Sequence, residues 1–207
     1  MIKIAHITDF DIADLSNAAW NAAEKTTIDK YWSGADAPVG RHFRVGLLWS
    51  ESGLYVLFEA YQTEPLVLNE KPDISRKTHK LWEHDVCEIF IAPDKDEPRR
   101  YLEFEVAPTG EWLDLIVDWR KSEPRDWGLR SGMETAASVE EELVTMAIKI
   151  PWSAFGQAPK IGEVWLGNIF RQVGFGETRG YLTWQPTMTL DPQFHVPDRF
   201  GEFIFVA

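Results

Sequence analysis

Apolar and polar residues alternate with a period of two along most of this chain, which is the pattern of strands that bury one face. The clearest case is the segment 43–62, where the alternation leads into a turn at 50–53 and an aromatic, branched run follows. This predicts a β-hairpin. A second hairpin is predicted over 101–118, because the Pro and Gly of the turn at 108–111 favour a tight reversal of the chain.

Shorter runs predict six further strands, at 85–92, 134–140, 143–150, 164–174, 181–184 and 200–206. Helical signals are few: a short turn over 14–20 and a single helical turn over 151–155 that proline opens. Short strands separated by turns predict an all-β fold. We expect a two-sheet antiparallel β-sandwich, immunoglobulin-like or jelly-roll in type, with a few short helical turns.

No internal repeat, low-complexity segment or linker interrupts this pattern. A chain of 207 residues fits one large all-β domain, so we predict a single domain over residues 1–207. Its longest irregular segments are 63–84, 119–133 and 175–199. Functional residues are expected on these segments, because a rigid scaffold holds loops while their sequence remains free to vary.

The composition adds an unusual number of aromatic residues. Twelve Phe and ten Trp are enough for a sizeable core, but ten Trp are more than one core usually needs, and Trp is favoured at binding surfaces because it is large and amphipathic. The formal net charge of -12 argues against a nucleic acid or an anionic membrane as the partner. Neutral ligands, cations and basic partners remain compatible with this charge, and the oligomeric state is left open.

Other features limit the class of protein. The single cysteine, Cys87, excludes an internal disulfide and lies in an apolar run, where a buried side chain is expected. No stretch approaches the roughly 18 apolar residues that span a bilayer. Residues 1–6 lack the basic and apolar regions of a signal peptide. As written, the chain is predicted to be cytoplasmic, whereas a chain trimmed from a longer precursor would be secreted or periplasmic.

Catalytic motifs are missing: there is no nucleophile elbow, no His-Glu-x-x-His and no phosphate-binding glycine loop. We therefore predict that the protein is not an enzyme. One alternative is a hydrolase or lyase acting on glycosides, since Glu103 and Glu105 share a strand face and could line one cleft. A further alternative is a protein-interaction domain that binds no ligand.

Metal binding has weak support in the sequence. The acidic segment 94–97 could offer oxygens to calcium, but it lacks the regular ligand spacing of a calcium loop. Asp191 and His195 lie in the last irregular segment, and nothing in their spacing requires a metal. We expect segment 94–97 to be a solvated loop, and we predict no required cofactor.

Carbohydrate binding fits the remaining features. A pyranose has an apolar face of C–H bonds that an aromatic ring can cover and a rim of hydroxyls that carboxylates, amides and Arg can bind. Aromatic residues on the irregular segments are Trp82, Trp119, Trp127, Trp184 and Phe194. Polar candidates near them in the sequence are Glu88, Asn168, Arg171, Gln185 and Asp191. The predicted function is non-catalytic binding of a mono-, oligo- or polysaccharide.

Several segments resemble the family 9 carbohydrate-binding modules. Residues 81–91 follow the family's pattern of tryptophan, acid or amide, x, Asp, x, x, Glu, apolar, Phe. Residues 19–23 and 45–49 are similar in style, and 101–110 and 192–201 fit the branch called family 9-like. The resemblance extends from about residue 18 to the C-terminus.

The resemblance implies a β-sandwich that binds sugars, often those of xylan or cellulose, in a slot between two aromatic rings. Trp82 would form one wall and Glu88 would accept hydroxyl hydrogen bonds. The second wall, a Trp in well-known members, is Phe194 here, and its polar partner is Asp191 rather than Asn. A smaller ring and a new charge change the slot. Bound calcium is common in the family, so the resemblance also makes a structural calcium ion an option.

Each candidate also has a structural alternative. Arg171 could bind ligand or form a salt bridge with Glu88, because a carboxylate within a strand needs a partner if it is buried. Trp184 is expected in the core or at the floor of the slot rather than as a stacking wall. Phe194 could close the end of the sandwich. The site expected from the sequence consists of Trp82, Glu88, Arg171, Trp184, Asp191 and Phe194.

Overall fold

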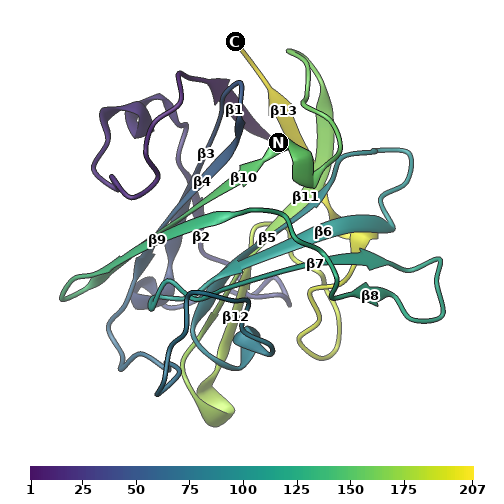
Figure 1. Cartoon of the computed structure of the whole chain (residues 1–207). Helices are drawn as coiled ribbons and strands as arrows, with labels where there is room; N and C mark the ends of the chain where they lie inside the picture. Colours follow the sequence, from purple (N-terminus) through teal and green to yellow (C-terminus); the bar gives the residue numbers. More distant parts are fainter.

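Strands account for nearly all of the regular structure in the computed structural model, which describes residues 1–207 (Figure 1). The strands are β1 (Ile2–His6), β2 (Thr26–Ile28), β3 (Phe43–Trp49), β4 (Gly53–Tyr61), β5 (Val86–Ala92), β6 (Arg100–Val106), β7 (Trp112–Asp118), β8 (Arg125–Asp126), β9 (Glu134–Val139), β10 (Leu143–Pro151), β11 (Val164–Val173), β12 (Gly180–Thr183) and β13 (Gly201–Phe205). The two predicted hairpins are β3–β4 and β6–β7. All six further predicted strands are present within one residue or so of their expected bounds.

Six short 3-10 turns connect the strands. They are η1 (Ala18–Ala22), η2 (Val39–Arg41), η3 (Leu81–Glu83), η4 (Trp152–Ala154), η5 (Gly176–Thr178) and η6 (Pro197–Arg199). The helical turn expected over 151–155 is η4, which follows Pro151 directly. No helix is long and apolar enough to cross a membrane.

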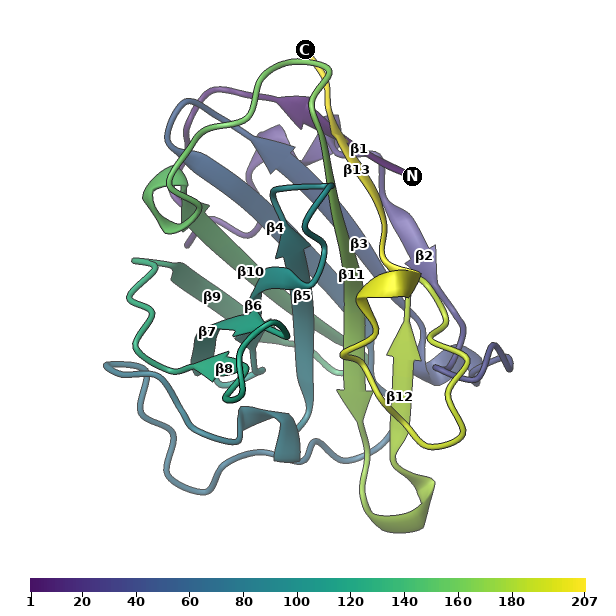
Figure 2. The ribbon, with the colours of Figure 1, turned by 90° about the vertical axis from the view of Figure 1, so that its right-hand side faces the viewer.

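The strands form two layers that β1 joins. One layer has the order β8-β7-β6-β5-β11-β13, with β12 paired to β11. The other has the order β3-β4-β10-β9, with β2 paired to β3. The first half of β1 pairs with β13 and its second half pairs with β3, both in parallel. Figure 2 shows β1 and β13 side by side where the layers meet. The all-β sandwich is confirmed, and β1 adds two parallel pairs to the antiparallel pattern.

Apolar side chains from both layers fill the space between them. On β6 the inward residues are Leu102, Phe104 and Val106, as the alternation predicts. Cys87 on β5 is fully buried there, and burial raises the pKa of its thiol to about 12. This layer of interdigitated side chains is the main core of the sandwich.

A second apolar cluster covers the outer face of the β8–β13 layer. Phe90, Tyr101 and Phe170 belong to it and are fully buried. The irregular segment before β13 packs onto this face, since Phe194 is in the same cluster. The outer face of this layer is therefore buried in part, and residues that point outward from β5, β6 and β11 lie under loops rather than in open solvent.

The main core yields a first prediction. Trp165 is fully buried against the rings of Phe155 and Phe205, at centroid distances of 5.0 and 4.9 Å. Replacing it with Ala removes a large ring from a close-packed site, so Trp165→Ala should lower the free energy of unfolding by about 3–5 kcal/mol. Urea denaturation measures this. Ile161→Ala, at a side chain 66% exposed, should change it by less than about 0.5 kcal/mol; equal effects would contradict the assigned packing.

Candidate functional site

A cavity of about 870 Å³ opens over the outer face of the β5, β6 and β11 strands. Its size lies within the usual range for small-molecule sites. The residues that line it are His79, Lys80, Trp82, Glu83, Glu88, Phe90, Glu103, Glu105, Arg125, Trp127, Gln172, Arg179, Tyr181, Pro192, Gln193, Phe194 and His195. All three irregular segments that were expected to carry function contribute to the lining.

Strand alternation explains why three glutamates meet at the floor of this cavity. On β5 the inward residues Cys87 and Ile89 are in the main core, so Glu88 points to the outer face. Antiparallel pairing sets Glu88 directly opposite Glu105, and Glu103 lies two residues along β6 on the same face. One carboxylate oxygen from each of the three lies within 4.8 Å of the others.

Burial dominates the electrostatics of this cluster. Glu105 is completely buried, and Glu88 and Glu103 are 2% and 4% exposed. Desolvation disfavours the charged form, and the neighbouring charge of Glu103 adds to it, which raises the pKa of Glu88 to about 8. Burial likewise raises the pKa of Glu103 to about 7 and that of Glu105 well above 4.5.

Two indole rings form an aromatic wall beside the carboxylates. Trp82 and Trp127 are both half-buried, with ring centroids 6.1 Å apart and planes inclined at 35°. Trp82 lies in the turn η3, whose N-cap Lys80 has φ 62° in the left-handed region that side chains rarely adopt. This backbone conformation sets the direction in which the turn leaves the preceding loop.

Arg179 holds the turn that carries Trp82. Its Nη2 donates to the carbonyls of Trp82 and His84 at 2.6 and 2.8 Å, and its Nη1 donates to the carbonyl of Glu83 at 2.8 Å. Nη2 also reaches Oε1 of Gln172 at 3.3 Å. Gln172 in turn donates from Nε2 to Oε1 of Glu88 at 2.7 Å. A chain of hydrogen bonds therefore connects the aromatic wall to the carboxylate floor.

Phe194 lines the cavity as a nearly buried ring rather than as an exposed wall. It is 7% exposed, and its ring is stacked on Phe170 at a centroid distance of 4.1 Å. The next residue, His195, hydrogen-bonds through Nδ1 to the hydroxyl of Tyr101 at 2.8 Å. Burial lowers the pKa of His195 to about 3, so its imidazole is neutral at physiological pH.

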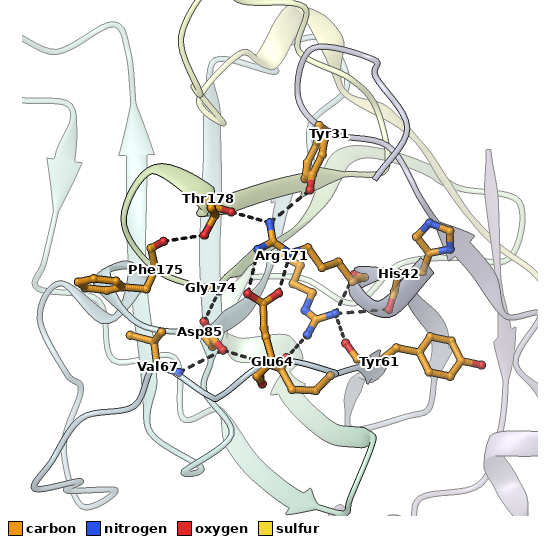
Figure 3. A network of polar contacts seen from close by, with 12 residues as sticks. Tyr31, His42, Tyr61, Glu64, Val67, Asp85, Arg171, Gly174, Phe175 and Thr178 are labelled. Atoms are coloured by element: carbon orange, nitrogen blue, oxygen red, sulfur yellow. Dashed lines mark hydrogen bonds and ion pairs between the residues drawn. The ribbon is translucent and has the colours of Figure 1, made fainter. Parts of the chain in front are cut away.

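Arg171 lies outside the cavity, on the face of β11 that it shares with the main-core residues Ile169 and Val173. Figure 3 shows the network of polar contacts around its guanidinium. Its Nη1 donates to the carbonyls of Arg41 and Tyr61, each at 2.7 Å. The guanidinium thus satisfies backbone carbonyls of two other segments of the chain. It cannot pair with Glu88 or reach a ligand in the cavity, because residues 171 and 88 point to opposite sides of the sheet.

Trp184 and Asp191 also lie outside the lining. The Trp184 ring is stacked on the Phe203 ring at a centroid distance of 5.3 Å and packs against the main core, one of the two places in which the sequence analysis expected it. Asp191 has an exposed side chain, and its backbone carbonyl accepts from Thr189 Oγ1 at 2.8 Å. Of the six residues expected from the sequence, the structure therefore brings together Trp82, Glu88 and Phe194.

Several residues that line the cavity were not predicted as site residues from the sequence. Trp127 was one of several aromatic residues on irregular segments, and the sequence did not distinguish it from the rest. Gln172 could have been found from strand parity, because it lies two residues after Phe170 on the outward face of β11. Arg179 acts through backbone carbonyls of a distant turn, for which the sequence carries no signal.

The acidic segment 94–97 forms an exposed turn that uses its own side chains. Asp94 Oδ1 accepts from the backbone N–H of Asp96 at 2.9 Å. Asp96 and Glu97 pair with Lys95 and Arg120, each at 2.9 Å. These contacts fit the solvated loop that was expected there.

Comparison with known families decides the class of protein. The sequence profile described as "Carbohydrate family 9 binding domain-like" matches residues 13–207. The chain belongs to this family. Membership makes it a non-catalytic carbohydrate-binding domain, which excludes the hydrolase or lyase alternative for Glu103 and Glu105. A buried Trp82 and a surface without a concave aromatic slot would have favoured the alternative of a domain without a ligand; Trp82 is half-buried and lines a cavity instead.

Solved structures share the fold of this family 9-like chain. A Bacteroides uniformis protein provisionally described as carbohydrate-binding is 19% identical, with a TM-score of 0.76 and coverage of 99% of this chain and 98% of that one. A family 9 module from Caldicellulosiruptor kristjanssonii in complex with cellotriose is 16% identical, with a TM-score of 0.71 and coverage of 100% and 93%. The glucose complex from that organism has a TM-score of 0.68, 17% identity and coverage of 98% and 95%.

One curated relative is also similar along most of its length. It is named as an extracellular protein from Arthroderma benhamiae and is 24% identical over an alignment of 176 residues, with coverage of 78% of this chain and 78% of the relative. Its name states a location and no ligand. The relative therefore adds nothing to the description of the site.

The raised pKa values predict how stability depends on pH. Carboxyls whose pKa is higher in the folded state stabilise the fold below their unfolded value of 4.5 and lose this contribution as pH rises through the folded values near 7 and 8. The free energy of unfolding should therefore fall between pH 5 and 8, by about 1.4 kcal/mol per pH unit for each carboxyl that ionises.

Urea denaturation at several pH values tests this, with EDTA present so that metal cations do not compete with protons. The isosteric Glu105→Gln should flatten the slope because it removes one ionising group. A wild-type stability that stays constant or rises from pH 5 to 8 would contradict the buried state of the cluster.

Proposed function

We propose that this domain binds a gluco-configured saccharide, either glucose or a short β-glucan such as cellotriose, in the cavity over β5, β6 and β11. The observation that carries the proposal is that two half-buried indole rings and a buried carboxylate line the same cavity. Trp82 and Trp127 offer faces for the apolar C–H surface of a pyranose. Glu88 offers an acceptor for its hydroxyls.

The polar groups of the lining suit a neutral ligand with many hydroxyls. Glu88 has one oxygen bonded to Gln172, which fixes the carboxylate and leaves the second oxygen for a hydroxyl. Arg125 and Gln193 add donors around the same cavity. Ordered partners reduce the entropy lost on binding, because Gln172 and Arg179 already hold each other in place.

Family membership narrows the ligand class, since the modules from Caldicellulosiruptor kristjanssonii were solved with cellotriose and with glucose. We include xylo-oligosaccharides in the proposal, because xylose presents the same apolar ring faces to the indoles. The floor differs from a simple neutral site, because three carboxylates replace the mixture of donors and acceptors that a sugar rim requires. That difference bears on how the ligand is held.

Isothermal titration with cellotriose and with xylotriose tests the proposal. Trp82→Ala should weaken binding by at least about tenfold, because it removes one stacking face worth about 1.4 kcal/mol or more. Phe175→Ala is the matched control: this ring is 78% exposed, also lies on an irregular segment and does not line the cavity. Its affinity should stay within about twofold of wild type.

Two outcomes would refute the proposed site. Wild-type protein that binds no gluco- or xylo-configured saccharide would remove its ligand class. Equal weakening by Trp82→Ala and Phe175→Ala would show that sugar binds elsewhere on the surface. Near-ultraviolet circular dichroism of each variant confirms that the sandwich is intact.

A further inference from the structure

The glutamates at the floor of the cavity have acceptor atoms that no protein donor reaches. Both carboxylate oxygens of Glu105 and Oε2 of Glu103 are shielded from solvent and receive no hydrogen bond. Glu105 is completely buried, and both residues line the cavity. Unpaired buried acceptors are rare because their desolvation is not repaid. The cluster therefore requires a partner from outside the chain, either protons or a cation.

No cationic side chain supplies that partner. No lysine or arginine nitrogen lies within 4.0 Å of a carboxylate oxygen of Glu88, Glu103 or Glu105. The imidazole of His195 lies 4.0 Å from Glu103 Oε2, but its Nδ1 is engaged by the hydroxyl of Tyr101. From side chains outside the cluster, the only hydrogen bond to it is that of Gln172 to Glu88, whereas a hydrogen bond between Glu103 and Glu105 needs a proton shared by the two carboxyls.

The donor set suits a calcium ion. One oxygen from each of the three carboxylates lies within 4.8 Å of the others, close enough for a single cation to contact all three. Mg²⁺ dehydrates reluctantly and is usually held by only one or two carboxylates, whereas Ca²⁺ takes six to eight oxygens and accepts several carboxylates. An all-carboxylate donor set also favours hard cations over zinc or copper.

The scaffold fixes these donors in advance. Glu88 and Glu105 are directly opposed across the β5–β6 pair, and Glu103 is on the same face of β6. All three come from strands rather than loops, so the positions of their Cα atoms do not depend on ligand. Three like charges held together by strand pairing repel one another, and one divalent cation neutralises two of them.

We propose that Glu88, Glu103 and Glu105 bind one calcium ion at the floor of the cavity. Calcium takes six to eight oxygens, and the three carboxylates supply between three and six of them. The remaining positions face the cavity, where water or two vicinal hydroxyls of the saccharide fill them. This last step rests on the proposed function, whereas the ion site itself does not.

Terbium luminescence tests the ion site without any sugar. Tb³⁺ matches Ca²⁺ in size, and indoles in the same cavity (Trp82 and Trp127) excite it by energy transfer. Wild-type protein at pH 8 should show saturable Tb³⁺ emission that Ca²⁺ displaces and that an equal concentration of Mg²⁺ does not. Glu105→Gln should weaken Ca²⁺ binding by about tenfold or more, because it removes one charged ligand.

Glu141→Gln is the matched control, since it removes an exposed carboxylate far along the chain from the cluster and outside the cavity. Its Ca²⁺ affinity should equal that of wild type. Glu105→Gln relieves repulsion between like charges, so it should unfold in EDTA at a temperature no lower than wild type, which shows that lost binding is not lost folding. Absent Tb³⁺ emission, or equal Ca²⁺ affinity of Glu105→Gln and wild type, would overturn the ion site.

Sugar titrations then separate the two proposals. Cellotriose should bind more weakly in EDTA than in excess Ca²⁺, by about tenfold, if its hydroxyls complete the coordination shell. Equal affinity in the two buffers would overturn the shared coordination while leaving carbohydrate binding in place. Failure of every saccharide to bind in either buffer would defeat the proposed function, and the terbium titration would still decide the ion site.

Discussion

The register between β5 and β6 is the constraint on which the site depends. It sets Glu88 opposite Glu105 and turns both toward the outer face, while their neighbours in the sequence fill the main core. A shift by one residue would exchange the two faces of β6, placing carboxylates in the core and Leu102 and Phe104 in the cavity. The large apolar burial on the inner face therefore holds the acidic floor in place. Stability on one side of the sheet supports polar chemistry on the other.

Irregular segments complete the site, and hydrogen bonds with charged side chains hold them against the rest of the chain. Arg179 binds the carbonyls around Trp82, and the buried Asp85 accepts from the backbone N–H groups of Val67 and Gly174 at 3.2 and 2.9 Å. Arg171 likewise donates to backbone carbonyls, those of Arg41 and Tyr61, and so links the two layers (Figure 3). Irregular backbone thus becomes a rigid part of the site, because charged side chains satisfy groups that no strand partner reaches.

Much of the sandwich could be predicted from the sequence, because alternation is a local signal. The strands β2 and β8 are only three and two residues long, too short for a period to be visible. β1 does alternate, with Ile2 and Ile4 buried, but its partners in the two layers lie far away in the sequence: Ile2 pairs with Phe203, and Ala5 pairs with Leu48. Local patterns carry no information on such distant partners.

The site was predictable to a lesser degree. Trp82 and Glu88 belong to one short sequence motif that runs from the turn η3 into β5, so the motif predicted them together. Arg171 was placed by residue type alone, although parity with Ile169 and Val173 points it into the core. Asp191 and Phe194 lie in a segment without periodicity, where only the folded chain decides which side chain turns inward.

The seam of the sandwich has a mechanical consequence. β1 and β13 run in the same direction, with Ile2 beside Phe203 and Ile4 beside Phe205. Tension applied between the start of β1 and the end of β13 pulls these neighbours past each other along the strand axis. The backbone hydrogen bonds across the pair then share the load at once instead of breaking one by one, as they would if the strands were peeled apart. The β1–β13 pair should therefore resist a pulling force along the strand axis more strongly than a strand pair of the same length that is peeled apart.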